Sequence, residues 1–335
     1  MASIRVAWRK GRPPASSGAH RLVARIGRVI FLGTGTFAVP LLRRLPELTT
    51  DLLVVSTPDR PAGRGLKPRP SPVAEAARAR DLDLATPERL RSDEGRAIVR
   101  DFAPDGLLLA AYGQLVPGEI LETGRRPPLN VHPSLLPRHR GAAPVAATIL
   151  AGDPVAGVSL MVMTPTLDAG PIVAQWPVAL DGRETTPELQ RRLAQLAADE
   201  VPGELVRWAD GDLSAIPQDE HAATPAPSFR RDDGWIDWRR PAQVIDRQVR
   251  ALQPWPGAWT TLDGRRLHVR QARAVAGVSG VPVGSVLPGE PPRVAAGSGA
   301  LELEVVQPEG RPAMPAGDWR RGQRDHLLLG TSAPD

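Results

Sequence analysis

The chain has 335 residues, 41% of them apolar, and carries a formal net charge of +5 with a sequence pI of about 10.6. It contains no cysteine, which excludes disulfides, thiolate metal ligands and a catalytic thiol. No apolar run approaches the ~18–20 residues that cross a bilayer, so we expect a cytoplasmic protein without membrane contact. Almost all of the positive charge is arginine, which fits either a GC-rich coding bias or a polyanionic partner, and the length predicts about two domains.

The first 28 residues carry seven basic side chains and no acidic one. This composition is typical of a transit peptide, but no clear amphipathic helix accompanies it. We therefore interpret residues 1–27 as a disordered leader, or as the product of an upstream start codon. Deletion of residues 1–25 is expected to leave folding and activity intact.

The first buried strand is predicted to begin at Arg28 and to lead through a glycine turn into a helix. Gly33 and Gly35, with Ala38, partly match the dinucleotide-binding fingerprint, in which glycines let the backbone approach a pyrophosphate. Because a strand, a glycine turn and a helix are common to many α/β folds, a nicotinamide-dependent oxidoreductase is only one alternative. The next strand is predicted at 52–57.

Residues 58–72 are predicted to form a basic loop between a strand and a helix. Five prolines and two glycines in this segment argue against regular structure. Such loops are typically ~2–6 residues long, so this one is unusual. Its four basic residues, against one acid, favour a role in phosphate contact over a merely solvated surface. The four are Arg60, Arg64, Lys67 and Arg69.

Helices and strands then alternate as in an α/β fold. Helices are predicted at about 73–80 and 93–101, and strands at 82–85 and 106–113. Ligands of open α/β sheets bind at the carboxyl ends of the strands. Tyr112 and Gly113, at the end of the last of these strands, are therefore predicted to reach the binding site.

The stretch 129–144 holds the strongest candidates for chemistry. Asn130 and His132 are two residues apart, so on a strand their side chains point to the same face. Asp168 follows at a turn after the next predicted strand. An amide, an imidazole and a carboxylate, without a serine or cysteine in a nucleophile context, favour transfer between bound substrates over a covalent enzyme intermediate. The spacing of His132 and His139 fits no common zinc pattern, so no metal site is expected.

The helices and strands of the α/β pattern continue to about residue 210, and the pattern changes after a linker. A helix is predicted at about 143–151, strands at 157–163 and 173–178, a long helix at 187–210, and a linker rich in proline and alanine at 213–230. Five or six short strands, the first at 235–238, and one helix at 241–252 then predict a small barrel. Its tryptophans are predicted to be core residues rather than base-stacking platforms: Trp235, Trp238, Trp255 and Trp259.

Five stretches form a specific combination: Asn130-Val-His132, Ser134 to Pro144, Leu167 to Gly170, Pro58 to Gly65, and Gln253 to Pro256. Because it contains these five stretches, the chain from residue 28 to about 325 resembles the methionyl-tRNA formyltransferase family. The resemblance implies a Rossmann-like formyltransferase domain at 28–212 and, after the linker, an OB-like β-barrel domain at 231–330 that binds tRNA. It implies transfer of a formyl group from 10-formyltetrahydrofolate, a consumed co-substrate with no permanently bound cofactor, to initiator methionyl-tRNA. We expect a monomer.

The resemblance also implies roles for individual residues. The family's catalytic trio corresponds to Asn130, His132 and Asp168. Its folate-binding turn corresponds to Ser134, Leu135, Leu136 and Pro137. The basic loop corresponds to the insertion that enters the acceptor stem of the tRNA. The family often has Tyr-Ala-x-Lys in the linker, where this chain has Pro225-Ala-Pro-Ser228, so a lysine that could contact tRNA is missing and Arg230 or Arg231 is the candidate substitute.

Two more alternatives stand beside the oxidoreductase. Formyl transfer to an amino sugar nucleotide would use the same trio with another acceptor, but would leave the basic loop and the barrel without an obvious use. A non-catalytic RNA-binding protein would explain the charge and the barrel, but it would leave the trio unexplained.

Overall fold

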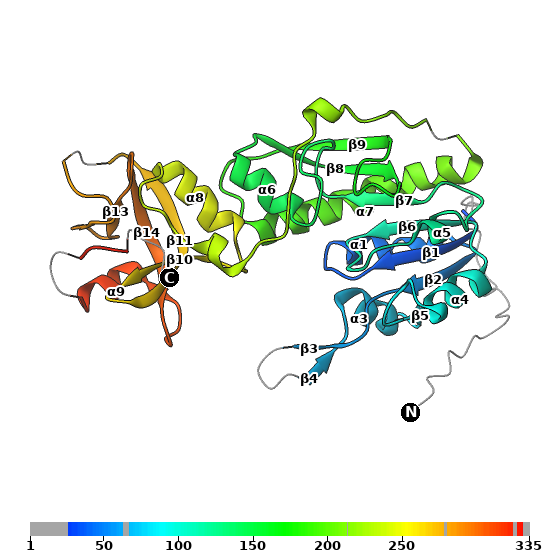
Figure 1. The fold of residues 1–335 in the computed structure, drawn as a ribbon, viewed down its shortest axis with the longest axis horizontal. Helices are drawn as coiled ribbons and strands as arrows, with labels where there is room; N and C mark the ends of the chain where they lie inside the picture. The colour runs from blue at the N-terminus through cyan, green and yellow to red at the C-terminus, as the bar shows by residue number, and fades with distance from the viewer. Residues whose placement is uncertain (1–25, 63–66, 213, 278–279, 324–326, 331–335) are drawn as a thin grey trace, which may run out of the picture. The chain divides into compact units, whose positions relative to one another are not determined.

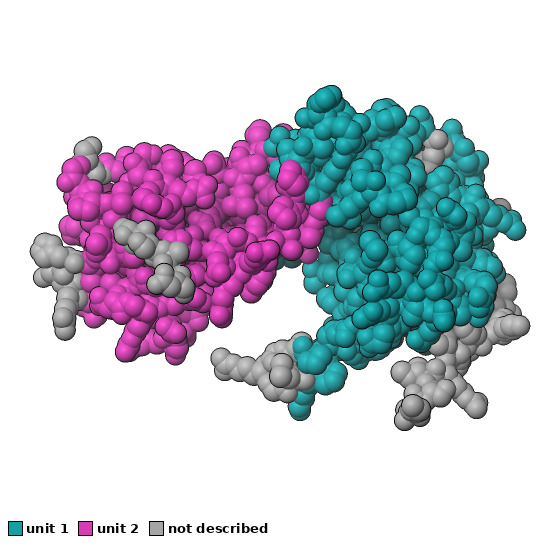
Figure 2. All heavy atoms as spheres, in the orientation of Figure 1, with its two compact units in different colours: residues 1–140, 157–177, 191–224 teal, residues 141–156, 178–190, 225–335 magenta. Residues whose placement is uncertain are grey.

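The computed structural model describes residues 26–62, 67–212, 214–277, 280–323 and 327–330. Contacts between residues divide the chain into two compact units, shown in different colours in Figure 2. Unit 1 comprises residues 1–140, 157–177 and 191–224, and unit 2 comprises residues 141–156, 178–190 and 225–335. No helix within the described residues is long and apolar enough to span a membrane.

Unit 1 is built on a seven-stranded sheet in the order β5-β2-β1-β6-β7-β8-β9 (Figure 1). In chain order the strands are β1 (Arg28–Gly33), β2 (Asp51–Val55), β5 (Asp83–Ala85), β6 (Gly106–Ala110), β7 (Leu129–His132), β8 (Val155–Val162) and β9 (Ile172–Ala179). Pairing is parallel from β5 to β7, whereas β8 runs antiparallel to β7. The first five strands have the order of a Rossmann-like sheet, which confirms the expected fold class.

Helices cover this sheet because its central strands β1, β2 and β6 are apolar and buried on both faces. They are α1 (Ala38–Leu42), α2 (Leu45–Leu48), α3 (Pro72–Ala79), α4 (Asp93–Phe102), α5 (Gly118–Leu121) and α7 (Thr186–Asp210). On one face, Ile30 and Leu32 of β1 pack in a buried cluster with Phe102 of α4. The helices α3 and α4 each begin at a serine, Ser71 or Ser92, whose hydroxyl accepts a hydrogen bond from a backbone N–H of the first turn.

The segment predicted as an irregular basic loop contains a hairpin separate from the main sheet, so that prediction was wrong (Figure 1). β3 (Arg60–Ala62) pairs antiparallel with β4 (Lys67–Arg69), and Pro61 lies opposite Pro68. Every second pair of an antiparallel ladder forms no hydrogen bonds between its strands. Because both prolines share one such pair, their missing N–H groups do not interrupt the ladder. Arg64 lies outside the described residues.

Unit 2 is organised around an antiparallel sheet in the order β10-β11-β14-β13-β12, with β15 also paired to β14. The strands are β10 (Ala258–Leu262), β11 (Arg265–Val275), β12 (Val286–Leu287), β13 (Arg293–Ala295), β14 (Ala300–Pro308) and β15 (Met314–Pro315). The helices are α6 (Pro144–Ala151), α8 (Ala242–Ala251) and α9 (Ala316–Arg321). Trp238, Val249 and Trp319 lie in its core cluster. This unit confirms the expected β domain after the α/β domain.

Two predictions for unit 2 were wrong in part. The expected strand at 235–238 is reduced to a single bridge between Trp235 and Trp259. A short 3-10 helix (Arg231–Gly234) occupies the chain just before this segment. The carbonyl oxygen of Trp235 accepts a hydrogen bond from Gln248 of α8 at 2.8 Å, so a side chain takes the place of a neighbouring strand. Trp238 and Trp259 are core residues, with 0% and 2% of their surface exposed. Trp255 is 60% exposed and is no core residue.

Candidate active site

The structure brings the three residues of the predicted catalytic trio together at the end of β7. All four residues of β7 are buried, and alternation along the strand places Asn130 and His132 on the same face. Asp168, from the turn after β8, is 7% exposed. Asn130 Nδ2 donates a hydrogen bond to Asp168 Oδ1 at 3.3 Å, and Asp168 Oδ2 lies 3.6 Å from His132 Nδ1. One carboxylate therefore contacts both the amide and the imidazole.

The Leu-Asp-Ala-Gly turn has a backbone that fixes where Asp168 points. Asp168 has a φ of 50°, in the left-handed region that aspartate tolerates better than most residues. A side chain at Gly170 would collide with the carbonyl oxygen of Val162, at the end of β8. Glycine at this position therefore lets the turn fold back closely onto the strand, which places the carboxylate beside β7.

The hydrogen bonds of His132 determine which ring nitrogen carries a proton. Nε2 lies 3.0 Å from the carbonyl oxygen of His139. Because a carbonyl oxygen only accepts, Nε2 is the donor. Burial lowers the pKa of His132, although the nearby Asp168 carboxylate opposes this effect. The neutral ring therefore turns Nδ1 toward Asp168 at a distance too long for a direct hydrogen bond.

The amide of Asn130 presents an acceptor that the protein does not use. Because Nδ2 donates to Asp168, the orientation of the amide is fixed and Oδ1 points away from the carboxylate. Oδ1 is buried and has no hydrogen-bond partner within the described part of the chain. Buried polar atoms are almost always paired. This atom is therefore suited to accept a hydrogen bond from a substrate.

Two residues that sequence reasoning missed hold the predicted folate-binding turn, residues 134–137, through hydrogen bonds to its backbone. Ser159 of β8 donates its hydroxyl proton to the carbonyl oxygen of Ser134 at 2.6 Å and accepts from the N–H of Leu136 at 3.0 Å. Gln175 of β9 donates to the carbonyl oxygen of Leu136 and to the Ser159 hydroxyl, both at 2.8 Å. A serine within the apolar sequence of β8 was the available signal.

Tyr112 and Gly113 follow β6, as predicted, but the tyrosine side chain packs against a hydrophobic cluster of unit 1. Its hydroxyl is buried, which raises the pKa of Tyr112. Gly113 donates its backbone N–H to the Thr34 hydroxyl at 3.2 Å. The backbone N–H groups of Thr34 and Gly35 donate to the carbonyl oxygen of Ala111, both at 3.1 Å. In a dinucleotide-binding turn, backbone N–H groups at these positions would donate to a phosphate. Here the two N–H groups already donate to a carbonyl oxygen of the protein.

The described basic residues of the hairpin are exposed. Arg60 forms an ion pair with Glu88 at 3.1 Å, and Arg60 and Arg69 are cross-strand partners. Lys67 and Arg69 are two apart on β4, so they share one face of the strand. The hairpin thus presents several positive charges at a spacing that the ladder fixes.

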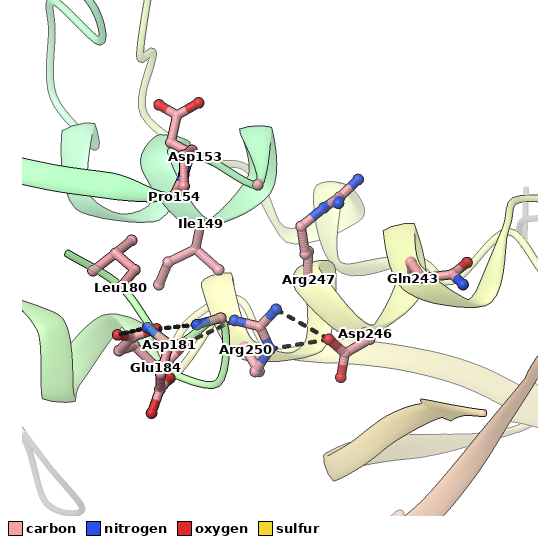
Figure 3. Close-up of a pocket in the computed structure, with 12 residues that line it drawn as sticks. Ile149, Asp153, Pro154, Leu180, Asp181, Glu184, Gln243, Asp246, Arg247 and Arg250 are labelled. Atoms are coloured by element: carbon pink, nitrogen blue, oxygen red, sulfur yellow. Dashed lines mark hydrogen bonds and ion pairs between the residues drawn. The ribbon is translucent and has the colours of Figure 1, made fainter.

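A separate hollow of about 380 Å³ lies within unit 2, beside α6 and α8 (Figure 3). Arg250 on its wall donates hydrogen bonds to Asp246 and to the carbonyl oxygen of Glu184. Its charged residues are the acids Asp153, Asp181, Glu184 and Asp246 and the arginines Arg247 and Arg250. This balance does not favour an anionic ligand. Across the described residues, no group of three or more histidines and acids is arranged to hold a metal ion.

Two family models match the chain, one to each part of the fold. Residues 27–203 match the model described as formyl transferase, and residues 229–324 match the formyl transferase C-terminal domain. Together with the Rossmann-like sheet that carries the buried trio, these matches define a formyl transferase.

Close relatives narrow this class. Methionyl-tRNA formyltransferases of Solibacter usitatus and Roseiflexus castenholzii are 40% and 44% identical over 298 and 304 residues, and each alignment covers 89% of this chain and 96% of the relative. The chain therefore belongs to the methionyl-tRNA formyltransferase family, as its motifs predicted. This membership removes the oxidoreductase and the non-catalytic RNA-binding protein from the alternatives.

Solved structures share the fold at low identity. HypX from Aquifex aeolicus, in complex with tetrahydrofolic acid, has a TM-score of 0.60 at 17% identity over 90% of this chain, which spans about half the length of HypX (50%). The sugar 3N-formyl transferase WlaRD has a TM-score of 0.63 at 14% identity over 86% of this chain and 100% of WlaRD.

Proposed function

We propose that the protein transfers the formyl group of 10-formyltetrahydrofolate to the α-amino group of initiator methionyl-tRNA, in the cytoplasm, and so supplies N-formylmethionyl-tRNA for translation initiation. The observation that carries this proposal is the buried contact of Asn130 and His132 with Asp168, in a chain that is at least 40% identical to methionyl-tRNA formyltransferases over most of its length. HypX, a fold neighbour, was solved with tetrahydrofolic acid, which fits a folate donor.

In the proposed reaction the α-amine attacks the formyl carbon, and the formyl oxygen becomes an oxyanion. The second N–H of Asn130 Nδ2 donates a hydrogen bond to this oxygen, and His132 Nδ1 donates another after it has taken up a proton from the ammonium form of the incoming amine, while Nε2 keeps its bond to His139. The unpaired Oδ1 of Asn130 accepts an N–H of the amine. Asp168 takes up the proton that the amine loses, and a proton returns to the folate nitrogen when its bond to the formyl carbon breaks, so the transfer is balanced.

We assign the folate donor to the turn at 134–137 because Ser159 and Gln175 hold its carbonyl groups in place. Tyr112 and Gly113 stay predicted folate contacts, through the backbone of their turn. The basic hairpin is assigned to tRNA. Arg60 lies across from Arg69 and pairs with Glu88, while Lys67 and Arg69 share one face of β4, so the excess positive charge of the hairpin favours an anionic partner.

The same assignment gives the two parts of the chain separate roles. Residues 28–212 would carry the reaction, and residues 231–330 would contribute to tRNA binding, with Arg230 or Arg231 in place of the family's linker lysine. We expect the enzyme to act as a monomer.

A direct assay tests the proposal. The purified protein is incubated with 10-formyltetrahydrofolate and one of three acceptors: charged initiator tRNA, free methionine or an amino sugar nucleotide. We expect formylation of the charged tRNA alone, and a loss of about 10²–10³ in rate for Asn130→Ala and His132→Ala. Formylation of the sugar nucleotide without formylation of the tRNA would overturn the proposed acceptor.

A further inference from the structure

Residues 216–224, called the strap below, lie in the segment predicted to be a linker, but they are fastened to unit 1 at both ends. Ile216 and Ile172 form an antiparallel bridge through two backbone hydrogen bonds of 2.8 Å. At the other end, the carbonyl oxygen of Thr224 accepts from the backbone N–H of Arg140 at 2.9 Å. The strap therefore connects the start of β9 to the loop that follows β7.

Gln218 joins the turn that carries Asp168 to the loop that follows β7. Its Nε2 donates to the carbonyl oxygens of Asp168 at 2.9 Å and Gly170 at 2.6 Å. Its Oε1 accepts from Nε and Nη2 of Arg140, at 3.0 and 2.8 Å. An amide side chain has two N–H donors and an oxygen with two lone pairs, so Gln218 uses its full hydrogen-bonding capacity between these loops.

Arg140 is held firmly enough to serve as the anchor for this connection. Its side chain is only 14% exposed, and it forms two hydrogen bonds of 2.8 Å with the carboxylate of Glu220, also from the strap. A paired arginine and carboxylate of this geometry is directional as well as strong. The position of Gln218 is therefore set by the strap on one side and by the Arg140 guanidinium on the other.

The strap also contacts the two strained residues of the site. Asp168 and His139 have φ angles of 50° and 61°, in the left-handed region that is unfavourable for most residues other than glycine, although aspartate and histidine tolerate it better than the others. Gln218 binds the carbonyl oxygen of Asp168, and the Thr224 hydroxyl accepts from the backbone N–H of His139 at 2.9 Å. The carbonyl oxygen of His139 in turn accepts from His132 Nε2. Each of these conformations is thus stabilised by a hydrogen bond from the strap.

We propose that the strap positions the catalytic trio for formyl transfer, and that Gln218 is its principal positioning residue. The inference rests on the proposed catalytic roles of Asn130, His132 and Asp168. Gln218 touches none of the reacting atoms: it holds the backbone of Asp168 so that the carboxylate stays between the amide and the imidazole. Displacing a catalytic group by about 1 Å can cost about 10²-fold in rate, so a lost brace has a measurable effect.

The test compares Gln218→Ala with a matched control. Single-turnover formylation of charged initiator tRNA should slow by about 10- to 100-fold in Gln218→Ala, while KM for tRNA and for the folate donor stays nearly unchanged. Gln195→Ala, which removes the same side chain from an exposed site on α7 where it contacts Asp199, should keep the wild-type rate. A wild-type rate in Gln218→Ala would overturn the proposal.

Two further variants separate positioning from anchoring and folding. Gln218→Glu keeps an acceptor for Arg140, but its carboxylate cannot donate to the carbonyl oxygens of Asp168 and Gly170, so it should be about as slow as the alanine variant. A wild-type rate would show that Gln218 only anchors Arg140, which overturns the proposal. Thr224→Val removes the acceptor for His139 at constant shape and should also lower kcat.

The outcomes distinguish this inference from the proposed function. If Asn130→Ala and Asp168→Asn keep wild-type turnover, the catalytic assignment itself fails. If those variants are slow while both Gln218 variants and Thr224→Val are fast, only the strap proposal is overturned. A loss of activity that simply follows a lowered melting temperature, with kcat unchanged per folded molecule, would also overturn it, because that is the result of a merely structural role.

Discussion

Replacement of Asp168 by asparagine removes one charge from the site and changes little else. Asparagine has the same shape, and it is among the residues that best tolerate the left-handed φ of 50° found at this position. Alanine would confound loss of the carboxylate with strain in the backbone. Asp168→Asn therefore isolates the electrostatic contribution of the carboxylate to Asn130 and His132.

The expected loss can be worked out from the two contacts of the carboxylate. Oδ1 accepts one hydrogen bond from Asn130, and the amide oxygen of the variant can still accept it, so only the extra strength that the charge gives this bond is lost, about 1–1.5 kcal/mol or roughly 5- to 10-fold in rate. Uptake of the proton from the amine contributes about 10²–10⁴-fold when a positioned group performs it. Because the same carboxylate serves both purposes, the factors overlap, and we expect a fall in kcat of about 10³-fold.

Single-turnover formylation of charged initiator tRNA at saturating folate donor measures this loss. Thermal unfolding and direct folate binding show whether the variant is folded and loaded. Asp199→Asn, an exposed position on α7 whose carboxylate contacts Gln195, is the matched control and should be unaffected. A rate within threefold of the wild type in Asp168→Asn would refute the assigned role of the carboxylate.

The remaining predictions concern the turn at 134–137, the basic hairpin and the β domain of unit 2. Ser159→Ala removes the hydroxyl that braces the turn at 134–137, so denaturant unfolding should show a loss of about 1–3 kcal/mol, and calorimetry weaker folate binding; unchanged folate affinity would contradict the brace. Lys67→Ala and Arg69→Ala should weaken tRNA use and each reduce the salt slope of binding by about 1, with folate binding intact; a defect in folate binding alone would contradict the tRNA assignment. Burial, together with neighbouring arginines, lowers the pKa of His268 from 6.5 to about 4, so the unfolded chain takes up a proton between these pH values that the folded protein refuses. Stability should therefore fall as the pH drops from 6.5 to 4, and urea titrations of His268→Gln should show a flatter decline than the wild type.

The sequence was most informative where function depends on neighbours along the chain. Asn130 and His132 are two apart on a strand, so their common face followed from the geometry of the strand alone. Alternating strands and helices predicted the α/β domain, and the short strands expected from residue 235 onward predicted the β domain. Asp168 was grouped with this pair by its residue type and by the resemblance to a family, but its contact with the pair could not be derived, because nothing in its local sequence tells how far the turn folds back.

Contacts between distant segments were beyond such reasoning. Gln218 lies 50 residues from Asp168 and 78 from Arg140, in a stretch whose proline and alanine content is typical of a linker. Ser159 gave only a weak signal as a polar residue in an apolar strand. The hairpin at 60–69 was missed for another reason: its prolines were counted as breakers, whereas their effect depends on which partner each one faces.

The facing prolines of the hairpin also determine how its edges meet other chains. In a pair without hydrogen bonds between its strands, the N–H groups point outward, to the two open edges of the ribbon. Pro61 and Pro68 occupy that pair, so each edge lacks the donor that an incoming strand would need. A short, exposed, two-stranded ribbon is a natural template for strand addition and aggregation. Here the proline pair leaves the ribbon folded and removes that hazard from both of its sides.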